Sequence, residues 1–226
     1  MIKFKEHFNI DEGVNDPAIF KAVFLAGGPG SGKSFVVGKT SLLSLGFKLI
    51  NSDINYENAL KKAGLTMEPE DIFSAQGQAL RDKAKKITGL QLELALKGRL
   101  GVVIDGTGKD YGKIQKSVNQ LRDLGYAVHM IFVNTDLETA QKRNKSRDRV
   151  LPTPAVKKMW DAVQKNIGKF QGLFRNRMTI VDNSDDADIE RSTLEAYKDI
   201  MTWAKKPPEN RLAQQWIKGQ KNDKIK

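Results

Sequence analysis

The segment from Gly27 to Ser34 constrains the fold of this chain more than any other part of its sequence. It reads Gly-Gly-Pro-Gly-Ser-Gly-Lys-Ser, which fills every fixed position of the pattern Gly-x-x-x-x-Gly-Lys-Ser. The apolar run at 22–26 is typical of a buried strand, and residues 34–43 can continue as a helix. A glycine-rich loop in this position turns successive backbone N–H groups toward an anion, next to the positive end of the helix. The sequence therefore predicts binding of a nucleoside triphosphate rather than a glycine-rich turn that binds nothing.

Two residues of this loop have predicted chemical tasks. The Lys33 ammonium is expected to reach the β- and γ-phosphates, and the Ser34 hydroxyl is expected to bind Mg²⁺. ATP and Mg²⁺ are therefore the predicted cofactors, and Lys33 is also a predicted catalytic residue. The predicted cofactor-binding residues are Gly28, Pro29, Gly30, Ser31, Gly32, Lys33 and Ser34.

Composition narrows the function classes. The chain contains no cysteine, which excludes disulfides, thiolate catalysis and cysteine-ligated zinc. No run approaches the roughly 18 apolar residues of a membrane span, and the N-terminus lacks the apolar core of a secretory signal. We therefore expect a cytoplasmic protein without membrane contact. The net charge of +11 favours an anionic partner such as nucleic acid, although a soluble basic surface gives the same excess.

Strand-like and helix-like segments alternate along the chain, which predicts an α/β fold with a mainly parallel, five-stranded sheet flanked by helices. The expected strands are 22–26, 48–51, 101–104, 128–133 and 178–181. The expected helices are 34–43, 68–97 with a break near 88–89, 110–124, 136–143, 156–170 and 194–204. A chain of 226 residues suits one such domain. We assign residues 19–204 to this domain, 1–18 to an N-terminal extension and 205–226 to a basic, loosely ordered tail.

Carboxylates follow two of the predicted strands, at the sheet edge where ligands of parallel sheets bind. Asp53 closes the second strand and can accept the proton of an attacking substrate hydroxyl, or it can cap the helix that follows. Asp105 closes the third strand and can hold Mg²⁺ beside Ser34, or it can be an ordinary turn aspartate. The segment 182–184 follows the fifth strand and reaches the same edge.

Three arginines stand shortly before Pro152. Arg143, Arg147 and Arg149 can stabilise the negative charge that spreads over a phosphoryl group during transfer. The alternative is a solvated basic helix end that complements the helix dipole. We expect these three residues to be catalytic, within an arginine-rich lid near 143–153.

The order of these motifs resembles the zeta-toxin family and the related polynucleotide 5′-hydroxyl kinases among small P-loop kinases. The resemblance covers about residues 20–185 and implies the P-loop kinase fold, with Lys33 and Ser34 on phosphate and Mg²⁺. It further implies that Asp53 is the general base and that Arg149 or a neighbour is the lid arginine. It rests on the phosphate loop, Asn51-Ser52-Asp53, Ile104-Asp105-Gly106-Thr107, Gly125-Tyr126-x-Val128, the arginines before Pro152 and Asp182-Asn183-Ser184.

The resemblance also bears on the acceptor substrate. Zeta toxins usually carry Glu-Gly-Thr followed by Arg and phosphorylate a UDP-activated amino sugar, whereas this chain has Asp-Gly-Thr-Gly-Lys at 105–109. An aspartate at this position is what polynucleotide kinases prefer. The implied acceptor is therefore a polynucleotide 5′-hydroxyl or a nucleotide sugar.

The N-terminal segment carries a second resemblance. Residues 3–8 followed by Ile10-Asp11-Glu12-Gly13 resemble tailed-phage proteins whose N-terminus directs packaging into the prohead. This implies a phage-encoded kinase that acts in the host cytoplasm or is packaged in the virion. The alternative is an ordinary amphipathic start to the domain.

The sequence therefore predicts a P-loop kinase that transfers the γ-phosphate of ATP to a hydroxyl of an anionic acceptor. One alternative is a nucleoside or nucleotide kinase. Another is a binding protein that uses ATP as a switch, which would not require a base such as Asp53.

Overall fold

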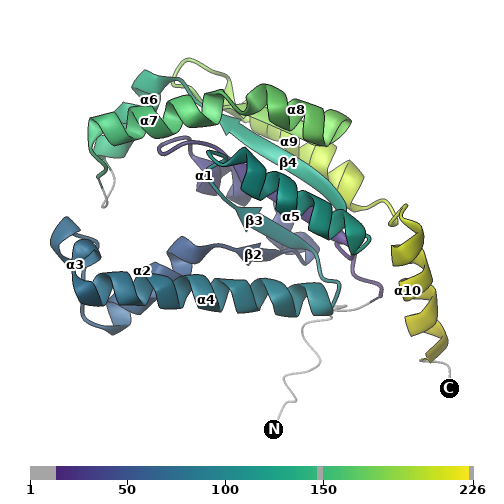
Figure 1. Cartoon of the computed structure of the whole chain (residues 1–226). Coiled ribbons are helices and arrows are strands. Elements are labelled where there is room, and N and C mark those ends of the chain that lie inside the picture. Colours follow the sequence, from purple (N-terminus) through teal and green to yellow (C-terminus); the bar gives the residue numbers. More distant parts are fainter. Residues whose placement is uncertain (1–13, 147–149, 224–226) are drawn as a thin grey trace, which may run out of the picture.

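A five-stranded, wholly parallel sheet forms the centre of the computed structural model, which describes residues 14–146 and 150–223 (Figure 1). The strand order is β2-β3-β1-β4-β5. This arrangement confirms the predicted α/β fold and the number of strands. The strands are β1 (Lys21–Ala26), β2 (Lys48–Ile50), β3 (Val102–Asp105), β4 (Ala127–Asn134) and β5 (Met178–Asp182).

The central strands are buried because helices cover both faces of the sheet. All six residues of β1 are buried, as are the six inner residues of β4. This is why they read as continuous apolar runs rather than as an alternating pattern. Two apolar cores result, one containing Phe24 and Phe132 and the other containing Val23 and Ile131.

The observed helices differ from the predicted ones more than the observed strands do. They are α1 (Lys33–Lys39), α2 (Ser52–Lys62), α3 (Pro69–Phe73), α4 (Ala75–Lys97), α5 (Tyr111–Asp123), α6 (Leu137–Lys145), α7 (Thr153–Gln164), α8 (Ile167–Phe174), α9 (Ile189–Ala204) and α10 (Arg211–Asp223), with short 3₁₀ turns η1 (Leu42–Leu45) and η2 (Arg175–Arg177). None of the described helices is both long enough and apolar enough to span a membrane.

One predicted helix break was misplaced, and one observed break was not predicted. The break expected near 88–89 lies instead at Ser74, whose hydroxyl accepts the N–H of Gly77 and caps α4. The single helix expected over 156–170 is two helices, interrupted near the buried Asn166. The Asn166 amide donates to the carbonyl oxygens of Gly108 and Lys109, so this break anchors the loop that follows β3.

The predicted loosely ordered tail is also corrected, because residues 211–223 form the helix α10. Ala213 on α10 is fully buried, and the Trp216 ring packs edge-on against Phe20 with 5.5 Å between ring centroids. Phe20 immediately precedes β1, so α10 lies at the edge of the sheet opposite the carboxyl ends of the strands (Figure 1). The basic tail is therefore remote from the phosphate loop. The resemblance to phage packaging segments falls on residues 1–13, outside the described part of the chain.

Candidate functional site

The loop from Gly27 to Ser34 joins β1 to α1, and two of its glycines, Gly30 and Gly32, occupy positions that strongly disfavour any other residue. Gly30 and Gly32 have φ angles of 76° and 81°, in the left-handed region. A Cβ atom on Gly32 would also lie 2.2 Å from the side-chain nitrogen of Asn183, and one on Gly30 would lie 2.5 Å from the carbonyl oxygen of Ala140. The loop is thus locked against the segments that follow β4 and β5.

Lys33, the first residue of α1, curls back over this loop. Its ammonium donates to the carbonyl oxygens of Gly27 at 2.9 Å and Gly28 at 3.4 Å. The hydroxyl of Ser31 is buried and has no hydrogen-bond partner among the described residues. The loop therefore presents a cation and a polar cradle of the kind that receives a phosphate chain.

Asp105 ends β3, next to β1 in the sheet, and lies close to both Lys33 and Asp53. Its Oδ2 accepts a 2.7 Å hydrogen bond from the Asn51 amide. Its Oδ1 is buried without a hydrogen-bond partner in the part of the chain that the structure describes. Burial raises the pKa of the Asp105 carboxyl; the positive charge of Lys33 opposes this rise, and the negative charge of Asp53 adds to it.

Asp53 lies in the first turn of α2 but does not cap it. The cap is Asn51, whose side-chain oxygen accepts the N–H of Asp53 at 2.7 Å. The interpretation of Asp53 as a helix cap is therefore wrong, and its exposed carboxylate is available for another task.

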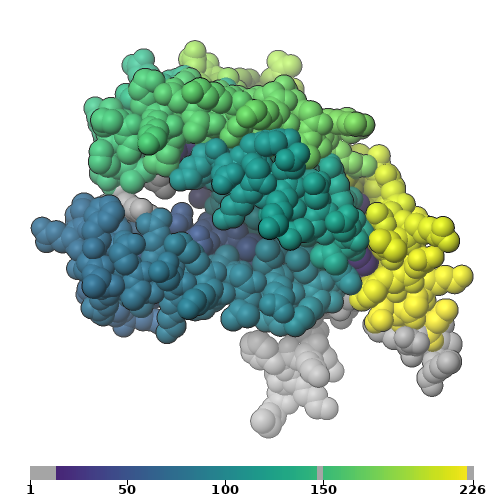
Figure 2. Space-filling view, viewed as in Figure 1, coloured from purple at the N-terminus to yellow at the C-terminus, as the bar shows by residue number. Residues whose placement is uncertain are grey.

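Two cavities meet at these residues. The first, of about 460 Å³, is called the front cleft; its lining includes Lys33, Asp53, Tyr56, Arg81, Lys109 and Met159. It opens between the segment α2–α4 and the segment α6–α7, where the surface is hollowed (Figure 2). The second, of about 570 Å³, is called the α1 groove; its lining includes Ser34, Gly38, Leu43, Ile54 and Arg143. Both cavities share Lys33, Asn51, Asp53, Glu57 and Asp105. The predicted loop, base and metal ligand thus surround one continuous space.

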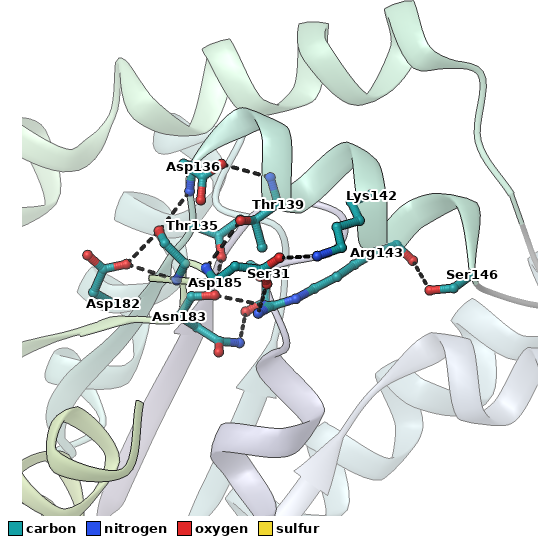
Figure 3. Close-up of polar contacts among 11 residues, drawn as sticks. Ser31, Thr135, Asp136, Thr139, Lys142, Arg143, Ser146, Asp182, Asn183 and Asp185 are labelled. Atoms are coloured by element: carbon teal, nitrogen blue, oxygen red, sulfur yellow. Dashed lines mark hydrogen bonds and ion pairs between the residues drawn. The ribbon is translucent and has the colours of Figure 1, made fainter. Parts of the chain in front are cut away.

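Arg143 is held beside the phosphate loop by residues that follow β5 (Figure 3). Its guanidinium donates to the Asn183 carbonyl oxygen at 2.7 Å and pairs with the Asp185 carboxylate at 2.9 Å. The Asn183 amide in turn donates to the carbonyl oxygen of Ser31 at 2.7 Å. Lys142 and Arg143 hold the pKa of the Asp185 carboxyl below its ordinary value, mainly through hydrogen bonds. Arg147 and Arg149 lie outside the described residues.

Sequence reasoning missed four residues that line the front cleft or orient its groups. Asn51 stood in a quoted motif but received no role, and Tyr56 and Glu57 follow Asp53 at the helical spacing that places them on its face. Arg81 carried no signal, because α4 only meets α2 through the tertiary fold. Thr107 and Lys109, on the loop that follows β3, also line this cleft.

Comparison with known proteins gives a family and a fold. Residues 23–169 match the family described as AAA domain. No curated protein matches the chain significantly.

Several solved structures share the fold at low sequence identity. An AvrRxo1-ORF1:-ORF2 structure with ATP aligns with a TM-score of 0.57 and 16% identity over 79% of this chain and 62% of that chain. A structure of the PezAT chromosomal toxin–antitoxin system of Streptococcus pneumoniae aligns at 0.52 and 15% identity, over 81% and 87%. The Pnkp1/Rnl/Hen1 RNA repair complex aligns at 0.50 and 21% identity, over 66% and 46%, so this chain spans less than half of that one. These likenesses concern the fold alone.

Proposed function

Because this chain belongs to the AAA domain family, which residues 23–169 match, we propose that it transfers the γ-phosphate of ATP to a hydroxyl group of an anionic acceptor. The fold resembles that of P-loop kinases. The observation that carries the proposal is the shared lining of the two cavities, which brings Lys33, Asp53 and Asp105 around one space. A nucleotide-binding loop alone would need only the first of these residues.

ATP is assigned to the loop from Gly27 to Ser34. The loop's left-handed glycines, its N–H groups and the Lys33 ammonium form an anion cradle at the start of α1. The AvrRxo1 structure of the same fold was determined with ATP, which agrees with this assignment. The cradle ends beside Asp105, where the γ-phosphate would lie.

The residues present also fit Mg²⁺. Ser34 and Asp105 both line the α1 groove, and the unpartnered, buried Oδ1 of Asp105 is a hard oxygen of the type that Mg²⁺ prefers. When bound, the ion neutralises charge on the β- and γ-phosphates. The Asn51 amide holds the other Asp105 oxygen and so fixes the orientation of the carboxylate.

Asp53 is the proposed general base. The acceptor hydroxyl gives its proton to the Asp53 carboxylate while the hydroxyl oxygen forms a bond to the γ-phosphorus. The bond from that phosphorus to the β,γ-bridging oxygen breaks, and its electron pair leaves with ADP. Arg143, Arg147 and Arg149 are proposed to stabilise the charge on the transferred group, within a lid near 143–153.

The acceptor is proposed to be a polynucleotide 5′-hydroxyl or a nucleotide sugar. The protein should be incubated with γ-labelled ATP and, separately, 5′-hydroxyl RNA, 5′-hydroxyl DNA, nucleosides and UDP-sugars. We expect label on an oligonucleotide or a UDP-sugar, and about 10²–10³-fold slower labelling with the Lys33→Ala protein. Label on free nucleosides would favour a nucleoside kinase, and tight ATP binding without transfer to any acceptor would favour a switch protein.

Asp105→Asn is expected to weaken Mg²⁺ binding without lowering the stability of the fold at neutral pH. Because the pKa of the Asp105 carboxyl is raised in the folded state, the folded protein keeps the proton on this carboxyl to a higher pH than the unfolded chain does. The folded state therefore binds more protons in that interval, so this group's contribution to stability falls as pH rises through it. At neutral pH the variant should unfold at the same temperature as the wild type or higher, and this advantage should vanish in acid, where both side chains are neutral.

The same variant should weaken Mg²⁺-dependent ATP binding by about tenfold or more. Thermal unfolding across pH and Mg²⁺ titrations of nucleotide affinity measure the two effects. The Asn51 hydrogen bond can persist, because an asparagine oxygen also accepts it. A loss of stability at neutral pH with unchanged Mg²⁺ dependence would show that Asp105 is an ordinary turn residue.

A further inference from the structure

The front cleft continues past the reacting groups to an end formed by Tyr56 on α2 and Arg81 on α4. The guanidinium carbon of Arg81 lies 5.8 Å from the centroid of the Tyr56 ring. Met67 packs against the same cluster and also lines the cleft. Helices α2 and α4 pack closely along their length, so this end of the cleft is a rigid part of the fold.

Within residues 14–146 and 150–223, neither the Tyr56 hydroxyl nor the Arg81 guanidinium has a hydrogen-bond or ion-pair partner. Tyr56 is only 2% exposed, yet its hydroxyl makes no hydrogen bond there. Arg81 is half-buried and takes part in no hydrogen bond or ion pair among these residues. Burying a donor without a partner costs free energy, so such a pair in a cleft points to a ligand that supplies the acceptor.

The charges in the cleft indicate the sign of that ligand. Asp53, Glu57 and Asp105 repel an anion, and Lys33 belongs to the phosphate loop. An anionic acceptor therefore needs a further cation, and Lys109 and Arg81 both line the cleft. Arg81, on α4, is the one that lies beside Tyr56, whose hydroxyl has no hydrogen-bond partner among the described residues. A guanidinium next to a hydroxyl offers several parallel donors, which suits the oxygens of a phosphate or carboxylate.

We propose that Arg81 and Tyr56 bind an anionic group of the acceptor, a phosphate or a carboxylate, and so select acceptors that carry one. This inference rests on the proposed function, because it places the acceptor in the front cleft. Asp53 and Tyr56 stand three residues apart on α2, a rise of about 4.5 Å along the helix axis. The proposed anion site therefore begins about one helical turn from the proposed base.

A purely structural role for Arg81 is the competing explanation, since its guanidinium also stacks on the Tyr56 ring. The two explanations differ in how residues of the cleft should respond to an added anion. A binding role makes the environment of Met67 respond to added anion in an Arg81-dependent way. A structural role changes stability in Arg81 variants but gives no such response.

The test follows the isotope-labelled methyl group of Met67 by NMR in the full chain saturated with Mg²⁺ and a non-hydrolysable ATP analogue. Inorganic phosphate and acetate are the probes, titrated at an ionic strength held constant with chloride. Phosphate and acetate report separately on the two anion classes. We expect a saturating Met67 shift with at least one of them, and an affinity about tenfold weaker in Arg81→Gln.

The matched control is Lys83→Gln, which removes an equal charge from an exposed position two residues further along α4. It should leave the titration unchanged. Tyr56→Phe should weaken the affinity without lowering the unfolding temperature, because the deleted hydroxyl has no partner to lose among the described residues. This second variant also keeps the test valid if Arg81→Gln fails to fold.

An unmoved Met67 signal with both probes, or an equal shift in wild type and Arg81→Gln, would overturn the proposal. Binding of the ATP analogue is measured in the same samples. Failure of the analogue to bind would count against the proposed function, while the Arg81-dependent Met67 response would still decide this inference. The two failures are therefore distinguishable.

Discussion

Lys33→Ala is expected to lower ATP turnover by about 10²–10³-fold, because it removes the cation of the phosphate loop at the point where charge develops during transfer. The Lys33 ammonium contacts the carbonyl oxygens of Gly27 and Gly28, so it already lies at the mouth of the cradle. Release of ADP and equilibrium binding of a fluorescent ATP analogue measure the effect.

Lys39→Ala is the matched control for this prediction. Lys39 is exposed at the end of the same helix, α1, and its ammonium stacks on the Phe35 ring. Its loss should leave turnover unchanged. A folded Lys33→Ala protein with normal ATP affinity and hydrolysis would remove the loop from the proposed site, and unfolding curves must first show that both variants fold.

Asp53→Asn is expected to retain ATP binding while lowering phosphoryl transfer by about 10²–10⁴-fold, the usual loss when a general base is removed. The fold should tolerate the change, because Asn51 rather than Asp53 caps α2. The loss of a favourable charge in the first helical turn should cost less than about 1 kcal/mol. Transfer of labelled phosphate to the acceptor is the measurement, with ATP affinity determined in parallel.

Asp161→Asn provides the control for Asp53→Asn. Asp161 is a carboxylate on α7 that forms an ion pair with the exposed Lys157, outside the lining of both cavities. Its neutralisation should leave transfer intact. Near-normal transfer by Asp53→Asn would instead assign Asp53 to the outer shell of the metal and leave the base unidentified.

The phosphate loop and the carboxylates at the strand ends were predictable because their signals are local. The loop motif occupies eight consecutive residues, Asp105 ends an apolar strand, and Asp53 stands three residues after the last residue of another. The rule that the carboxyl ends of parallel strands share one edge then places them together without any knowledge of helix packing. The five strands were found within a residue or two because each contains a short run of mainly apolar residues, which is also a local signal.

The errors fall where tertiary packing outweighed a local signal. Gly89 suggested a break, but it lies within the 23-residue helix α4, whose packing on α2 outweighs the cost of one glycine. The polar, lysine-rich tail suggested disorder, yet Ala213, Trp216 and Ile217 give α10 an apolar face that covers the end of the core. Three apolar residues in a basic segment are a weak signal until the surface that they cover is known.

The sequence by itself determined the phosphate-loop motif, the parallel sheet and the edge at which the candidate site lies, because each depends on residues adjacent in the chain or on strand polarity. Only the tertiary structure decided which side chains meet there. The contact of Arg143 with Asn183 spans 40 residues, and that of Asn51 with Asp105 spans 54. The pairing of Tyr56 with Arg81 likewise depends on how α2 packs against α4. Such contacts arise from the packing of separately formed helices and strands, and no local pattern of residue types specifies that packing.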